Sequence, residues 1–455
     1  MKIFTQKLFL QIDNSPLIIF RILLGLLLFI ESFGSILTGW VKNNLITPRI
    51  LFPFIGFEWL HPLPGYGMYF YFALMAILGL FVMIGYRYKA SLFCFLLLWT
   101  AQYLMQKTSY NNHYYFLILI CFIMLFLPAN AYCSFDSKRN KRLKSLFMPQ
   151  WCSYVLMLQI AILYFYATIA KLYPDWLDGT FTRLLYSNKT NFPVIGKYFT
   201  EKWFYLPIAY LGILFDGLVV PLLLWKKTRT IALIANIIFH LSNSLILQVG
   251  IFPYFALSFV VFFYPPETIR RIFFRNRPTL QPYIDNVNFK GINVLKYLFI
   301  PYFMIQIFLP LRHWLIEGDV FWTEEGHRLS WRMMLRKRSG YPIQFLIIDK
   351  KTGKEVKNTY SKNNLSISFS LDHLLTEKQK NKINTSPDVI WQMAQYIKKD
   401  FKQKGIDVAV YADCWVSINN HPYKRLINEK TDLANVKWNY FTHSPWIILY
   451  EDYRK

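Results

Sequence analysis

Long apolar runs are the feature that most constrains how this 455-residue sequence can fold. A transmembrane helix needs about 20 mainly apolar residues to cross a bilayer. Runs close to that length recur through the first two-thirds of the chain, so we expect an α-helical polytopic membrane protein with about nine transmembrane helices. The predicted segments are 16–39, 66–86, 90–105, 113–130, 154–172, 206–225, 230–248, 251–264 and 294–311. The short segment 251–264 also fits a re-entrant or broken helix.

The placement of the basic residues predicts an orientation in the membrane. A formal net charge of +25 is compatible with nucleic-acid binding. The charge is concentrated, however, in the loops that would be cytoplasmic if the N-terminus is cytoplasmic, including KRNKRLK at 138–144 and RRIFFRNR at 270–277. This asymmetry follows the positive-inside rule. We therefore expect a cytoplasmic N-terminus, basic loops close to anionic membrane lipid, and no nucleic-acid partner.

The C-terminal third has a different composition and predicts a separate domain. Residues 312–455 are charged and polar, and nine crossings would place them outside the cytoplasm, in a periplasm or lumen. The segments 343–356 (IQFLIIDKKTGKEV) and 407–427 (DVAVYADCWVSINNHPYKRLI) each read as a β-hairpin around a turn. Between them, 386–405 has a Ser-Pro-Asp start, helical spacing and a terminal glycine. We predict a membrane helical bundle over 1–311 and a small extracytoplasmic α+β domain over 312–455.

Metal and disulfide chemistry have no support in the sequence. The five cysteines form no CxxC pair, and no HExxH pattern occurs. We therefore predict no metal site. The chain also lacks a Walker loop and a dinucleotide fingerprint.

Polar residues inside the apolar runs are the candidate functional residues, because they are costly to place in hydrocarbon. Two of them stand out. Lys171 ends the apolar stretch YFYATIA in the segment YFYATIAKLYPDWLDG, and His113 lies in YNNHYYF. Alternating crossings would place both on the same side of the membrane. The remaining candidates at membrane depth are Arg21, Glu31, Asp216, His240 and Asn243.

Each of these residues also has a purely structural interpretation. A lysine near a helix end commonly extends to the headgroups. His113 can be a helix-start residue with interfacial hydrogen bonds. Arg21 and Glu31 can pair with other buried groups and fix helix packing, and the polar residues around His240 can bridge helices.

Six blocks of the sequence resemble, in order, the vitamin K-dependent γ-glutamyl carboxylase family, in a short form of bacterial type. The first four lie in the apolar region and the last two in the C-terminal region. They are FRILLGLLLFIE, YNNHYYFLILICFIMLFLPANAYCSFD, YFYATIAKLYPDWLDG, FHLSNSLILQVGIFPY, LSWRMMLRKRSG and DCWVSIN. The sequence departs from the vertebrate pattern at Ala170, where that pattern has the first of two lysines. Its C-terminal region is also shorter than in the vertebrate pattern, in the part that is associated with substrate recognition.

The resemblance implies a reaction between reduced vitamin K or menaquinol, oxygen, carbon dioxide and a glutamate-containing protein or peptide. A base deprotonates the quinol, and oxygen adds to it to form a strongly basic alkoxide. The alkoxide removes a proton from the glutamate γ-carbon. Carbon dioxide traps the resulting carbanion, and the quinone leaves as its epoxide. Lys171 aligns with the base, and burial would favour the uncharged amine that a base needs. His113 aligns with a residue beside the quinol, where it would orient or stabilise the oxygenated intermediate.

The other site residues implied by the resemblance fall into two groups. Asn112, His240, Asn243 and Phe252 would support or line the quinone pocket. Asp175, Trp176, Trp331 and Arg338 would lie on the substrate side or serve the structure. Two alternatives stay open: a quinol epoxidase of the same family that does not carboxylate glutamate, and a non-enzymatic transporter that uses buried charge. The sequence shows no two-half repeat of the kind common in transporters, which counts against the transporter alternative.

Overall fold

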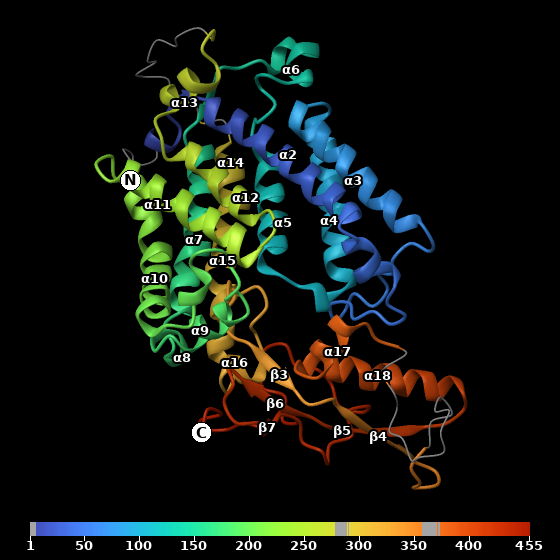
Figure 1. The fold of residues 1–455 in the computed structure, drawn as a ribbon. Helices are drawn as coiled ribbons and strands as arrows, with labels where there is room; N and C mark the ends of the chain where they lie inside the picture. Colours follow the sequence, from blue (N-terminus) through green and yellow to red (C-terminus); the bar gives the residue numbers. More distant parts are fainter. Residues whose placement is uncertain (1–5, 278–288, 290, 357–370, 372–373) are drawn as a thin grey trace.

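Figure 1 shows a long helical bundle with a smaller region of strands and helices at one end. This computed structural model describes residues 6–277, 289, 291–356, 371 and 374–455. The long helices of the bundle are α2 (Ser15–Leu37), α3 (Gly67–Ile84), α4 (Tyr88–Met105), α5 (Asn112–Phe126), α7 (Trp151–Ala170), α10 (Lys202–Leu224) and α11 (Arg229–Ser242). Shorter helices are α6 (Phe135–Arg139), α8 (Pro174–Leu177), α9 (Thr180–Ser187), α12 (Phe252–Ser258), α13 (Pro266–Phe273), α14 (Ile292–Val294), α15 (Ile300–Phe308) and α16 (Val320–Thr323).

All nine predicted segments coincide with helices, and the prediction of a helical membrane protein is confirmed in part. Among the described residues, six helical segments are long and apolar enough to cross a membrane. They are Ser15–Leu37, Gly67–Ile84, Trp151–Ala170, Lys202–Leu224, Arg229–Leu247 and Ile292–Leu315. Asn112–Phe126 and Phe252–Phe262 are apolar but shorter, and α4 carries polar residues such as Lys89 and Gln102. The number of nine crossings therefore stays a prediction.

The basic clusters and the C-terminal region lie at opposite ends of the bundle. Figure 1 shows α6 and α13, in which the two clusters begin, at one end, and the strands of the C-terminal region at the other. At the α13 end, a short sheet pairs β1 (Gln11–Asp13) with β2 (Phe147–Pro149). Asp13 there accepts ion pairs from Arg270 and Arg277. Part of the basic charge is therefore neutralised internally.

The C-terminal region has the predicted mixture of helices and strands, with one difference in pairing. Three strands form the order β3 (Arg338–Gly340), β6 (Trp415–Ile418), β7 (Lys424–Arg425), and a second sheet pairs β4 (Gln344–Asp349) with β5 (Val408–Asp413). The helices are α17 (Glu377–Ile383) and α18 (Pro387–Gln403). The predicted 407–427 hairpin is present as β6 and β7, and the predicted helix is α18, which ends before Gly405 at φ +78°.

The predicted 343–356 hairpin is present around its turn, where the amide of Val356 donates to the carbonyl oxygen of Ile347. An antiparallel bridge joins Ile348 to Glu355 across this turn. In addition, β4 pairs with β5 in antiparallel register over six residues, a pairing that the sequence did not predict. The β5 strand offers six consecutive partners, and four of its side chains are buried.

Buried ion pairs connect this region to the membrane helices. The Asp388 carboxylate at the start of α18 lies 2.7 Å from the Lys107 ammonium, in the loop between α4 and α5, and also pairs with Arg328. Burial lowers the pKa of Lys107 to about 8. Burial alone would raise the pKa of Asp388, but the charges of Arg328 and Lys107 outweigh it and lower that pKa. Breaking such a buried group of charges is costly, so the two regions are held together firmly.

Candidate active site

Lys171 lies at the end of α7 and pairs with Asp216 in the middle of α10. The α-helix ends at Ala170, and the Lys171 side chain turns into the bundle with only 9% of the residue exposed. Its Nζ donates a hydrogen bond to Oδ2 of Asp216, which is itself 5% exposed. The ammonium also lies 5.3 Å from the ring centroid of Trp176. Lys171 therefore does not extend to the headgroups; a buried carboxylate offsets the cost of burying its charge.

Two histidines flank this pair, each held by an aromatic partner. The His113 ring, in the first turn of α5, stacks on Phe252 at a centroid distance of 4.0 Å and an angle of 10°. His240 near the end of α11 bonds through Nε2 to the Tyr164 hydroxyl at 2.8 Å. Phe252 also meets His240 edge to face at 6.0 Å. The rings are thus fixed in position on three different helices.

These side chains line one small cavity. Its volume is about 130 Å³, and its walls include the candidates from the sequence, namely Lys171, His113, Asp216, His240, Asn243, Phe252 and Trp176. The other walls are largely apolar, with Met333 and Met334 from the C-terminal region closing one side. This volume is below the roughly 300–1,000 Å³ of typical ligand pockets, but the cavity shares walls with three larger neighbours.

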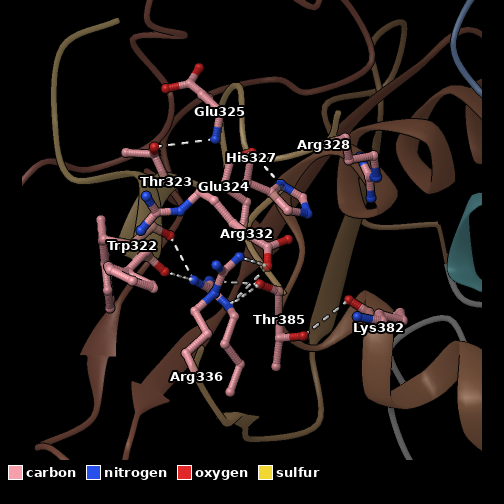
Figure 2. A network of polar contacts seen from close by, with 12 residues as sticks. Trp322, Thr323, Glu324, Glu325, His327, Arg328, Arg332, Arg336, Lys382 and Thr385 are labelled. Carbon is pink, nitrogen blue, oxygen red and sulfur yellow. Dashed lines mark hydrogen bonds and ion pairs between the residues drawn. The ribbon is translucent and has the colours of Figure 1, made fainter. Parts of the chain in front are cut away.

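A basic cavity lies on the other side of His113 and Met334. Its volume is about 400 Å³, and its basic lining residues are Arg332, Arg336, Arg338, Lys378 and Lys382. Glu324 is the sole acidic residue among the described residues of that lining. Figure 2 shows Glu324, Arg332 and Arg336 side by side, with Lys382 and Thr385 facing them from the neighbouring helix and loop. Positive charge is in clear excess.

The charges in the basic cavity are held in a fixed arrangement. Arg336 donates to Oε1 of Glu324 at 2.6 Å, whereas Arg338 donates to the carbonyl oxygens of Trp322 and Thr385. Burial opposes ionisation of Glu324, but His327 and the arginines hold its pKa well below the usual range. Burial lowers the pKa of Arg332 to about 10, so this guanidinium stays charged at neutral pH. The arrangement suits an anionic ligand.

The remaining predicted residues lie outside the Lys171 cavity. Asn112 lines the basic cavity, where its amide donates to the carbonyl oxygen of Arg332. Asp175 accepts hydrogen bonds from Asn419 and His421, so it joins α8 to the β6–β7 turn. Trp331 is fully buried in the core.

The two charged residues of the first span, Arg21 and Glu31, have different surroundings. Arg21 donates to the carbonyl oxygens of Ala129, Tyr132 and Cys133, which fixes the loop after α5. Glu31 lines a cavity of about 370 Å³ with mostly apolar walls, and His113 is also part of that lining.

Sequence reasoning missed several residues of the site. Tyr164 lies seven residues before Lys171, which is two helical turns and therefore the same face of α7, so its spacing was a usable signal. The basic lining residues of α17, Lys378 and Lys382, had no such signal, because they come from a distant part of the chain. No group of three or more histidine, cysteine, aspartate or glutamate side chains that could hold a metal ion occurs in the part of the chain that is described.

The fold and the site together define a class, namely a polytopic helical membrane protein with a buried lysine–carboxylate pair beneath a basic α+β region. Comparison with known families identifies the family within this class. The HTTM domain matches residues 9–267, more than half of the chain, and the lumenal domain of vitamin K-dependent gamma-carboxylase matches residues 292–453. The chain belongs to the vitamin K-dependent gamma-carboxylase family. No solved structure matches it.

Proposed function

We propose that this protein is a membrane carboxylase that converts glutamate in a protein or peptide to γ-carboxyglutamate while it epoxidises a naphthohydroquinone. The co-substrates would be reduced vitamin K or menaquinol, oxygen and carbon dioxide, without a metal. The observation that carries the proposal is the placement of Lys171 and Asp216 in an apolar cavity that shares His113 and Met334 with a basic cavity. The first cavity suits a quinol, and the second suits a carboxylate.

Lys171 is the proposed base, and Asp216 makes it usable. An ammonium group cannot accept a proton, but the pair holds one proton that either group can carry. When the amine passes its proton to Oδ2 of Asp216, Nζ can accept the proton of a quinol hydroxyl. The pair then carries one net positive charge, which stabilises the quinolate beside it.

The histidines are proposed to position the quinol. His113 lines the cavity, and its stacking on Phe252 holds the ring in a fixed orientation. His240 is fixed by Tyr164. Apolar walls around these rings exclude water, which would otherwise protonate a carbanion formed at the glutamate γ-carbon.

The basic cavity is the proposed place for the glutamyl carboxylate. Arg336 and Lys382 line that cavity together with Met334. A carboxylate held there would leave its γ-carbon directed towards His113. In this arrangement the division at residues 311 and 312 separates a quinol-binding bundle from a substrate-binding domain, with the N-terminus cytoplasmic and the C-terminal domain outside.

A product assay tests the proposal. Purified protein receives reduced vitamin K or menaquinol, oxygen, labelled bicarbonate and a glutamyl peptide, and both epoxide and γ-carboxyglutamate are measured. We expect both products from the native protein, neither from Lys171→Ala, and both from the exposed-lysine control Lys202→Ala. Epoxide without γ-carboxyglutamate would favour the epoxidase alternative. Full epoxidation by Lys171→Ala would refute the assignment of the base.

A further inference from the structure

Met334 lies where three cavities of the structure meet. These are the Lys171 cavity, the basic cavity and the cavity that Glu31 lines. Among the described residues of the three linings, His113 and Met334 are the two that all of them share. The Lys171 cavity and the basic cavity have one further lining residue in common, Met333. A very small set of side chains therefore separates the proposed quinol site from the proposed carboxylate site.

Within this set, Met334 has the space to move. The residue is 41% exposed, whereas the His113 ring is held by its stacking on Phe252 at a centroid distance of 4.0 Å. Methionine is unbranched and has three rotatable side-chain bonds, so it adapts its shape easily. The Met334 side chain can thus give way to a ligand without a change in the helices around it.

The backbone at Met334 is held in a conformation that residues other than glycine rarely adopt. Its φ is +48°, and Leu329 and Trp331 shortly before it have φ values of +62° and +58°. Left-handed residues of this kind are strained, persist where the surroundings fix them, and are common at functional sites. Here the fully buried Trp331 side chain anchors the segment.

Hydrogen bonds fix the chain on both sides of Met334. The Asn112 side-chain amide donates to the carbonyl oxygen of Arg332 at 3.1 Å, and the Tyr173 hydroxyl donates to the carbonyl oxygen of Leu335. These two donors come from the start of α5 and from the residue before α8, next to the proposed catalytic side chains. The strained backbone therefore holds Met334 at one defined place between the two cavities.

The two cavities need opposite solvent conditions. The basic cavity has an excess of positive charge from Arg332, Arg336, Lys378 and Lys382, and such charges need water when no anion is bound. The Lys171 cavity has to stay dry, because water would protonate a carbanion. A side chain between the two cavities must therefore exclude water and still admit the glutamyl side chain.

We propose that Met334 is a specificity-determining residue of this site, a movable divider that keeps water in the basic cavity away from the quinol and gives way to the glutamyl side chain. The inference rests on the proposed function. With the divider in place, the carbanion at the γ-carbon forms its new bond to carbon dioxide. Without it, the carbanion takes a proton from water, no carbon–carbon bond forms, and the glutamate is released unchanged.

Two variants of Met334 form a matched pair, because alanine and leucine carry the same left-handed backbone strain as the native residue. Leucine keeps the volume of the divider, and alanine removes it. With quinol, oxygen, bicarbonate and glutamyl peptide in D2O, we expect Met334→Ala to lower the ratio of γ-carboxyglutamate to epoxide at least about fivefold and to raise deuterium incorporation at the γ-carbon by a similar factor. Met334→Leu should keep both within about twofold of the native protein. A native ratio in Met334→Ala would refute the proposal, as would equal changes in the two variants.

A labelling measurement tests the position of the divider without any turnover. The exposed native thiols Cys94 and Cys133 are first replaced by alanine. Met334→Cys is then modified with a sulfonate-bearing methanethiosulfonate reagent in lipid nanodiscs. We expect saturating oxidised menaquinone and saturating glutamyl peptide each to slow this modification at least about fivefold. The control is Leu346→Cys on β4, which is 44% exposed and lines none of the three cavities, and neither ligand should slow its modification.

The outcomes separate this inference from the proposed function. Lack of modification of Met334→Cys in the ligand-free protein, or protection by one ligand or by neither, would overturn the divider. If both ligands protect Met334→Cys but the native protein forms neither epoxide nor γ-carboxyglutamate, the proposed function fails while the position of the divider stands. If the native protein forms both products and Met334→Ala forms them in the native ratio, the divider fails while the proposed function stands.

Discussion

The Lys171–Asp216 pair predicts a large energetic coupling between two residues on different helices. Two opposite charges 4 Å apart attract each other by about 4 kcal/mol at an effective dielectric constant of about 20. Both groups are buried, with side-chain exposures of 11% and 6%. Removing one partner leaves the other charge buried and alone, which typically costs about 3–5 kcal/mol. Replacing both with apolar side chains removes that penalty.

The corresponding experiment is a double-mutant cycle with Lys171→Met, Asp216→Val and the double variant. Unfolding is followed by tryptophan fluorescence in mixed micelles with increasing SDS. Each single variant should lose about 3–5 kcal/mol of unfolding free energy, and the double variant should lose less than either. The exposed pair Lys404 and Asp400 serves as the control and should couple by less than about 1 kcal/mol.

One outcome of that cycle would refute the reasoning. If the losses of the two single variants add to within about 0.5 kcal/mol in the double variant, the groups are not coupled in the folded protein. The base would then lack the proton partner on which its proposed role depends.

Three further predictions follow from other parts of the site. Phe252→Ala removes the stacking partner of His113, so the KM for the quinol should rise about 2- to 10-fold. Arg336→Gln should raise the KM for the glutamyl peptide about tenfold or more and leave the KM for the quinol within about twofold. The lowered pKa of Asp388 contributes stability above about pH 4 that is lost as the pH falls, so Asp388→Asn should be less stable at pH 7 and show a flatter acid limb in thermal unfolding.

The sequence predicted the helices and the family because both depend on local patterns. Apolar runs of sufficient length located every long helix of the bundle, and Lys171 and His113 stood out because each interrupts or begins such a run. Short-range signals also located α18 and the β6–β7 turn. These features require no knowledge of how distant segments pack.

The pairings between distant segments could not be predicted from the sequence. Asp216 was recognised as a buried charge, but its partner is 45 residues earlier in the chain, and no spacing rule connects α7 to α10. The basic cavity likewise combines arginines near 332–338 with lysines of α17. The β4–β5 pairing was missed for the same reason, since a local turn signal predicts only the nearer partner of β4. Tertiary contact, not propensity, determines these features.

The central claim is that Lys171 removes a proton from a bound naphthohydroquinone, and absorbance without oxygen tests it directly. The protein is mixed anaerobically with the quinol at neutral pH, and the spectrum of the quinol monoanion is recorded for the native protein, Lys171→Met and the control Lys202→Met. We predict the monoanion in the native protein and the control, and its absence in Lys171→Met until the pH is raised. Equal monoanion formation in Lys171→Met at neutral pH would contradict the account.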